Sequence, residues 1–170
     1  MSASTLLTSL FKYKAWANGE ILEKMKLFEP PAQAAERHNA IRILNHTYVV
    51  DRIFAANLQR LKHEYSTTNT TETPTLEQLE SAIKKSDAWY IEYVSKLTLE
   101  HLGETIDFTF TDGALGRMSR EEMLTHVVLH GGYHRGAIGR IMAQLSIPPG
   151  RDVFTGFLHL AEATSRRRVG

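Results

Sequence analysis

Four long stretches of the chain carry apolar side chains at intervals of three and four residues, the spacing that places them on one face of a helix. The stretches cover residues 4–28, 39–62, 75–97 and 119–145. Helix-breaking or polar segments separate them, with Pro30-Pro31 after the first and Pro148-Pro149-Gly150 after the last. At 170 residues the chain has the length of one domain. The pattern predicts an all-α fold, a four-helix bundle formed by residues 1–170.

The ends of two helices and the linker between them bear on the topology. Thr75 with Gln78, and Ser119 with Glu122, have the spacing of capping boxes and predict where the third and fourth helices begin. The polar linker 63–74 can span about 40 Å when extended. The second helix, at about 24 residues, is about 36 Å long. The linker is therefore long enough to return along the bundle and make the second and third helices parallel.

A short strand signal precedes the fourth helix. Ile106, Phe108 and Phe110 alternate with polar residues, and Asp112-Gly113 is a strong turn dipeptide. We therefore expect a short β-hairpin-like insertion before the fourth helix. Beyond that helix, three residues are expected to pack back onto the bundle: Phe154, Phe157 and Leu158. The run Arg166-Arg167-Arg168 is expected to be a solvated terminus.

Composition excludes several classes of chemistry. The chain has no cysteine, which excludes disulfides, thiolate nucleophiles, iron–sulfur clusters and cysteine-ligated zinc. With 20 Lys and Arg against 19 Asp and Glu, the net charge of +1 argues against a nucleic-acid binder that neutralises phosphates. No run of 18 apolar residues predicts a membrane span, and residues 1–5 lack the features of a secretory signal. We expect a cytoplasmic protein without a membrane or nucleic-acid partner.

Histidines on the inner faces of two helices are the candidates for chemistry. At 100° per residue, His130 and His134 lie within the apolar face of the fourth helix, whereas His126 lies toward its edge. His46 shares the apolar face of the second helix with Ile43. A single inward histidine is more often a core residue with a hydrogen-bond partner. Three from two helices favour a three-histidine metal site with positions left for water or substrate.

Residues beside these histidines, together with one lysine of the first helix, indicate what kind of site this is. Gly131 follows His130 where a metalloprotease motif would carry its general-base glutamate, so that class is excluded. Gly131-Gly132 is costly in a helix and indicates either close helix packing or room for a substrate. Arg135 lies away from the centre of the apolar face, as expected for a structural ion pair or an interface residue. Lys14 is expected at the edge of the first helix's apolar face.

The histidine segment also resembles a known family. Residues 126–138, HVVLHGGYHRGAI, resemble the pattern H-x-x-x-H-x-x-x-H-R-G-x-I of the DinB family, the damage-inducible, metal-dependent four-helix proteins. Residues 13–18 resemble its Y-x-x-W-A-N pattern, and residues 44–54 its L-x-H…D-x-x-aromatic helix. Asp112-Gly113, Asp152 and residues 155–158 also fit. One departure is Ala137, where members often carry Gln.

The resemblance implies an up-down-down-up bundle that is usually a homodimer. It also implies a divalent metal, nickel or zinc, held at the positions of His46, His130 and His134, with His126 outside the ligand set. Relatives include transferases that join thiols such as bacillithiol to electrophiles, and mycothiol-dependent maleylpyruvate isomerases.

The leading functional hypothesis is a metal-dependent enzyme in which the bound ion activates a low-molecular-weight thiol, or water, against a small electrophile. Because the chain lacks cysteine, the thiol would come from solution. No residue stands out as the general base, and Asn18, Asp51 and Tyr13 are candidates for lining the cavity or for structural polar contacts. The alternative is a non-catalytic metal-binding stress-response protein that acts through dimerisation or a partner. DNA binding, suggested only by the family's name, is disfavoured by the charge balance.

Overall fold

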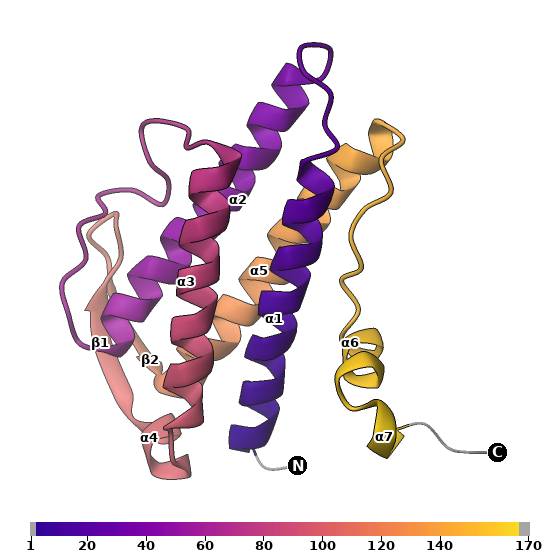
Figure 1. The fold of residues 1–170 in the computed structure, drawn as a ribbon. Coiled ribbons are helices and arrows are strands. Elements are labelled where there is room, and N and C mark those ends of the chain that lie inside the picture. Colours follow the sequence, from indigo (N-terminus) through magenta and orange to yellow (C-terminus); the bar gives the residue numbers. More distant parts are fainter. Residues whose placement is uncertain (1–2, 167–170) are drawn as a thin grey trace.

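The computed structural model of the chain describes residues 3–166, so the predicted exposure of Arg167 and Arg168 lies outside the described part. Four long helices form the bundle: α1 (Ala3–Met25), α2 (Ala34–Leu58), α3 (Leu76–Ser95) and α5 (Arg120–Gln144). In Figure 1, α1 and α5 run in one direction, and α2 and α3 run in the other. The predicted all-α bundle with up-down-down-up order is confirmed. None of the helices in residues 3–166 is long and apolar enough to cross a membrane.

The linker between α2 and α3 returns along the outside of α2, as its length predicted (Figure 1). The Arg42 guanidinium donates to the Thr70 carbonyl at 2.6 Å, and the Asn45 amide donates to the Thr70 hydroxyl at 2.7 Å. Both donors belong to the first half of α2. These bonds fix the end of the linker beside the start of α2, so that α3 begins there and runs parallel to α2.

Local side-chain chemistry sets the starts of α3 and α5. Both predicted capping boxes are formed: the Thr75 hydroxyl accepts from the Gln78 backbone N–H, and the Ser119 hydroxyl from that of Glu122, each at 3.2 Å. The Gln78 and Glu122 side chains accept from the cap backbone N–H groups in return. Each box satisfies two amide groups that a helix start leaves without partners.

The insertion before α5 begins with a short helix, α4 (Leu99–Gly103), and continues as an antiparallel hairpin of β1 (Thr105–Thr109) and β2 (Leu115–Ser119). Ile106 and Phe108 point into the core while their neighbours in β1 are exposed, which is the predicted alternation. Gly113 has a φ of 89°, the left-handed conformation that the turn requires. The hairpin was predicted, but the bounds of β2 were not, because its side chains are exposed or half-buried and carry no apolar alternation.

The chain after α5 packs back on the bundle, as predicted. It forms α6 (Phe154–Ala161) and α7 (Ala163–Arg166). The ring of Phe154 lies 5.3 Å from that of Tyr13 between centroids, and Phe157 lies 5.8 Å from Trp16. The tail is therefore held against α1 by aromatic contacts.

The predicted bounds of the second helix, 39–62, were wrong, because α2 spans Ala34–Leu58. It ends in a Schellman motif: the Leu61 N–H donates to the Ala56 carbonyl, and the Arg60 N–H to the Asn57 carbonyl, both at 2.9 Å. Arg60 takes the left-handed conformation, with a φ of 59°. Leu61, which lies within the predicted range 39–62, is consequently outside the helix and 59% exposed.

The core consists of two apolar clusters with a polar layer between them. On α1, Leu7 and Phe11 belong to the cluster beside the hairpin, and Ile21 and Met25 to the cluster at the other end. Between them, every long helix contributes polar residues that are less than a tenth exposed: Lys14, Asn18, Asp51, Ser86, Asp87 and Arg135. The positions of His46, His130 and His134 fall in the same interval along α2 and α5. The three histidines and the polar layer therefore lie at the same level of the bundle.

Candidate metal centre

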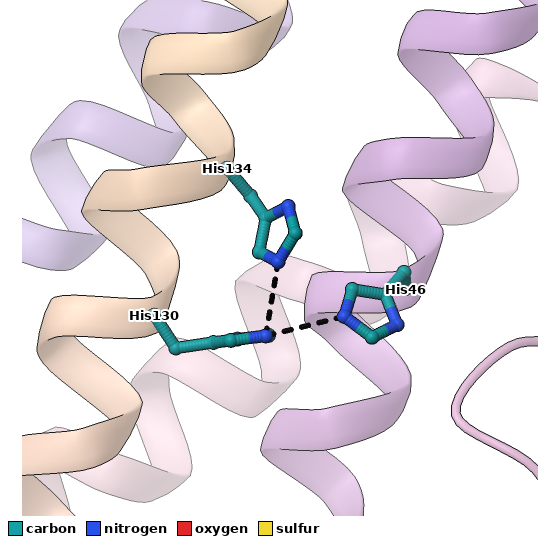
Figure 2. Close-up of side chains that lie close together, drawn as sticks. All are labelled: His46, His130 and His134. Carbon is teal, nitrogen blue, oxygen red and sulfur yellow. Dashed lines mark hydrogen bonds between the residues drawn. The ribbon is translucent and has the colours of Figure 1, made fainter.

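The three histidines predicted from the helical wheels lie together, as Figure 2 shows. His130 and His134 are one turn apart on α5, and His46 faces them from α2. Nε2 of His130 lies 3.2 Å from Nε2 of His46 and 3.0 Å from Nε2 of His134. One ring nitrogen from each residue lies within 4.8 Å of the others, so this group could hold a metal ion.

A backbone carbonyl orients the His46 ring. Nδ1 of His46 lies 2.7 Å from the Thr68 carbonyl oxygen, which can only accept a hydrogen bond. Nδ1 therefore carries the proton, and the lone pair of Nε2 is directed at the other two histidines. A second partner that fixes the tautomer in this way is typical of metal-binding histidines.

The surroundings favour the neutral form of the two histidines on α5. Burial, together with the neighbouring histidines and Lys14, lowers the pKa of His130 to about 3. Burial also lowers the pKa of His134, with His46 contributing. Neutral imidazole is the form that binds metal ions.

The spacing of the nitrogens fits a transition metal ion. Two nitrogens bound to one ion at about 2.0–2.1 Å lie about 3.0–3.4 Å apart. The two contacts made by Nε2 of His130 have this spacing, yet a single N–H can donate along only one of them. A cation shared by the three lone pairs would satisfy both contacts, and imidazole suits zinc and nickel.

His126 lies outside this group. Its ring stacks on Phe54 at 4.7 Å and on His130 at 5.2 Å between centroids. Burial lowers the pKa of His126 as well. The residue thus links the histidine triad to the apolar cluster beside the hairpin.

A buried ion-pair network lies in the same layer. The Lys14 ammonium is fully buried and donates to Asp51 at 2.6 Å and to Asp87 at 2.9 Å. The Asn18 amide also donates to Asp87. The expectation that Lys14 sits at the edge of an apolar face was wrong, because its charge is compensated by carboxylates from α2 and α3.

Arg135 extends this network to the tail. Its guanidinium donates to Asn18 at 2.9 Å and to Asp152 at 3.0 Å, and the Tyr13 hydroxyl also donates to Asp152. Burial and the Asp152 carboxylate raise the pKa of Tyr13 to about 12, so the hydroxyl keeps its proton. Arg135 forms a structural ion pair, as predicted. Tyr13, Asn18 and Asp51 all have partners inside the network.

Comparison with known proteins identifies the family of the chain. The model of the DinB family matches residues 1–167. The chain belongs to the DinB family. A curated relative, Protein DinB of Bacillus subtilis (strain 168), is 24% identical over 151 residues, covering 79% of this chain and 83% of the relative. No solved structure gives a significant match to the chain.

Gly131 of this DinB-family chain makes room for the network. A Cβ atom there would lie 3.1 Å from Nη1 of Arg135 and 3.4 Å from Cε of Lys14. At Gly132 the nearest heavy atom would be Nη2 of Arg135, at 3.9 Å. Of the two interpretations of the glycine pair, close packing applies to Gly131, whereas Gly132 leaves space.

Sequence reasoning missed three contributors to the DinB-family site: Lys14, Asp87 and Thr68. A lysine within an apolar stripe indicates that a buried acidic residue lies opposite, but it does not identify that residue. Asp87 lay in a mixed helix face and gave no such signal. Thr68 acts through its carbonyl, which every residue type has.

Proposed function

We propose that His46, His130 and His134 hold a divalent transition metal, nickel or zinc, and that the chain is a metal-dependent enzyme. The observation that carries the proposal is the convergence of three imidazole rings, one of them oriented by the Thr68 carbonyl. A divalent ion held by these three residues would supply Lewis-acid chemistry and would lower the pKa of a thiol or water. The substrate class is a small electrophile, and the thiol comes from solution because the chain has no cysteine.

The chain's own residues hold the site in place. His46 presents a fixed tautomer, and the network around Lys14 keeps α1, α2 and α3 in register beneath α5. Three protein ligands leave coordination positions open, the arrangement found in catalytic rather than structural sites. Asp51 and Asp87 are bonded to Lys14, so the proton of an incoming thiol would leave to solvent or to the substrate.

Metal content tests the site itself. Tag-free protein should carry about one transition metal ion per chain by elemental analysis, as a single three-histidine site requires. His46→Ala and His130→Ala should each lose it. His38→Ala, on the exposed start of α2, is the matched control and should retain it. Full retention in His46→Ala would exclude the site across α2 and α5.

Thiol transfer tests the activity. Metal-stripped protein, reconstituted with nickel or zinc, should transfer bacillithiol or glutathione to monochlorobimane, and His130→Ala should abolish the transfer. If metal-loaded protein instead hydrolyses ester or amide substrates, water takes the place of the thiol. Absence of turnover with every thiol and hydrolysable substrate, despite bound metal, would contradict an enzyme.

That last outcome would favour the second candidate, a non-catalytic metal-binding stress-response protein. The observation on its side is that both buried acids nearest the layer's centre are engaged by Lys14, which leaves no evident general base. A cytoplasmic location and the absence of nucleic-acid binding stay predictions from the sequence. Salt-sensitive binding to DNA at physiological ionic strength would contradict the latter.

We also propose a homodimer formed through α1 and α5. Leu6 and Leu10 of α1 line a hollow of about 660 Å³ together with Leu129 of α5. Leu129 is 68% exposed, and Tyr133, one turn further on, is 76% exposed. Light scattering should give twice the chain mass, and Leu129→Glu should give the monomer. Leu115→Glu, on the hairpin, is the control and should stay dimeric; a monomeric wild type would contradict the proposal.

A further inference from the structure

A second cleft lies between α2, α3 and the start of the linker. It has a volume of about 920 Å³, and its walls are formed by Tyr48 and Arg52 of α2, by Lys85 and Trp89 of α3, and by residues 61–65. At 100° per residue, Tyr48 and Arg52 lie 200° and 240° around α2 from His46, on the opposite side of the helix. None of the three histidines of the candidate metal centre lines this cleft.

The charge of the cleft is positive and uncompensated. Arg52, Lys62 and Lys85 line it, and none of them takes part in an ion pair within residues 3–166. Glu64 is the one acidic residue among the lining side chains of the described chain, and it is exposed. Arg52 comes from α2 and Lys85 from α3, so each of these two walls carries a basic side chain.

Three aromatic side chains also line the cleft. Trp89 is half-buried and stacks on Tyr93 with ring centroids 4.7 Å apart, which holds the indole in place. Tyr48 and Tyr65 reach the cleft from α2 and from the linker. Fixed aromatic faces of this kind bind planar rings by stacking and by apolar contact.

A polar group at the base of the cleft lacks a partner. Ser86 is 2% exposed, lines the cleft, and its hydroxyl oxygen has no hydrogen-bond partner among the described residues. Nδ1 of His63, on the linker side, is buried and also without a partner. Leaving a buried hydroxyl unsatisfied costs about 1–3 kcal/mol. Both residues line the cleft, and these are the polar side-chain atoms of its wall that lack a partner among the described residues.

We propose that this cleft is a binding site for a small planar aromatic anion, a carboxylate or a phosphate monoester. Arg52 and Lys85 hold the anionic group, Trp89 packs on the ring, and Ser86 bonds to a polar atom of the ligand. The site is separate from the histidine triad. A ligand should therefore bind in the cleft whether or not metal is present. Failure of this proposal would leave the proposed metal-dependent activity untouched.

The test uses 2-naphthoate and its neutral isostere 2-naphthamide as probes, with full-length protein kept in chelator. Two-dimensional NMR follows the indole N–H groups of the two tryptophans, assigned with Trp89→Phe and Trp16→Phe. The Trp89 signal should shift on titration with 2-naphthoate while that of Trp16 stays. The protein should bind 2-naphthamide at least about ten-fold more weakly than 2-naphthoate, because the amide lacks the charge-assisted hydrogen bonds.

Matched variants locate the anion. Arg52→Gln and Lys85→Gln should each weaken the binding of 2-naphthoate about three- to ten-fold and leave the affinity for 2-naphthamide unchanged. Arg140→Gln, an exposed arginine of α5 outside the cleft, should change neither, and unchanged unfolding midpoints show that the variants are folded. A titration with 2-naphthyl phosphate shows which anionic group is preferred. Equal affinity for the charged and neutral probes, or 2-naphthoate binding unaffected by both cleft variants, would overturn the proposal.

Discussion

Lys14 holds together the middle of the bundle, because one ammonium group neutralises carboxylates from two other helices. It has no exposed surface, so water cannot take over if the pairing is lost. Asp87 receives a further hydrogen bond from Asn18, whereas Oδ1 of Asp51 is buried without a partner. Two carboxylates share one cation, and Asp51 is the less well stabilised of them.

Lys14→Met should therefore destabilise the protein strongly. It leaves two buried carboxylates without their cation, and breaking a buried ion pair in this way costs about 3–5 kcal/mol. Urea unfolding followed by circular dichroism measures the loss. Lys12→Met, exposed on the same helix, should stay within about 0.5 kcal/mol of the wild type. Equal stability of the two variants would show that the network contributes nothing.

The pH dependence of stability should reveal Asp51. Burial raises its pKa from 3.8 to about 6, against the opposing effect of Lys14. Because the folded pKa is above the unfolded one, the folded state binds this proton more tightly. The resulting stabilisation is complete below about pH 4 and is lost as the pH rises through 6.

Between pH 4 and 6, deprotonation of Asp51 should lower the free energy of unfolding by at most about 1.4 kcal/mol for each unit by which the pH rises. Asp51→Asn removes the titration. The stability of the variant relative to the wild type should therefore improve as the pH rises over this range, in urea unfolding at fixed ionic strength. A pH-independent difference would mean that Asp51 is ionised throughout.

At the residue scale, the directions of the three histidines could be predicted and the ion pairs could not. A helical wheel needs only the geometry of one helix, and it placed His46, His130 and His134 inward. The partners of Lys14 lie 37 and 73 residues away, so their identity depends on how the helices pack. Thr68 was beyond prediction for another reason, since its contribution is a backbone atom.

At the scale of the helix, Gly131 and Gly132 allow a matched comparison. Gly132→Ala should stabilise α5 by up to about 1 kcal/mol, because alanine favours the helix and its methyl group meets only ordinary contacts. Gly131→Ala should gain nothing or lose stability, because its methyl group crowds Lys14 and Arg135. Thermal unfolding of the two variants measures the difference. Equal stabilisation by both would contradict the close approach of Lys14.

Helix boundaries could be predicted where a side chain sets them. The caps that begin at Thr75 and Ser119 are local, because each box spans four residues and can be recognised from the residue types. The end of α2 could not be predicted, because the residue in the left-handed conformation there is Arg60 rather than glycine. The same limit applies to β2, which pairs with β1 through backbone bonds and has few apolar side chains to mark it.

At the scale of the whole molecule, metal binding should stabilise the fold, because the site joins α2 to α5. A ligand at 100 times its dissociation constant adds about 2.7 kcal/mol. For a chain of this size the melting temperature then rises by about 5–10 °C. Nickel or zinc added to stripped protein should produce this shift in scanning calorimetry, and His46→Ala should abolish it. A shift that survives in His46→Ala would place the stabilising ion elsewhere.

The topology could be anticipated from linker length and from the family resemblance, whereas the polar layer could not. The layer assembles from α1, α2, α3 and α5 only once the up-down-down-up order brings their midpoints together. The tail adds Asp152 to the layer from outside the bundle. These contacts depend on the packing of the whole chain, which no single segment encodes.

The bond from His46 to the Thr68 carbonyl has a consequence for how this protein tolerates mutation. The side chain at position 68 is exposed, and the main chain supplies the acceptor, so nineteen other residue types can present the same oxygen. Substitution of Thr68 therefore leaves the acceptor of His46 in place, whereas a deletion that shortens the loop withdraws it. The side chain of Thr70 has a different part, since its hydroxyl bonds to Asn45 and holds the loop against α2. At position 68 the path of the main chain matters and the residue type does not.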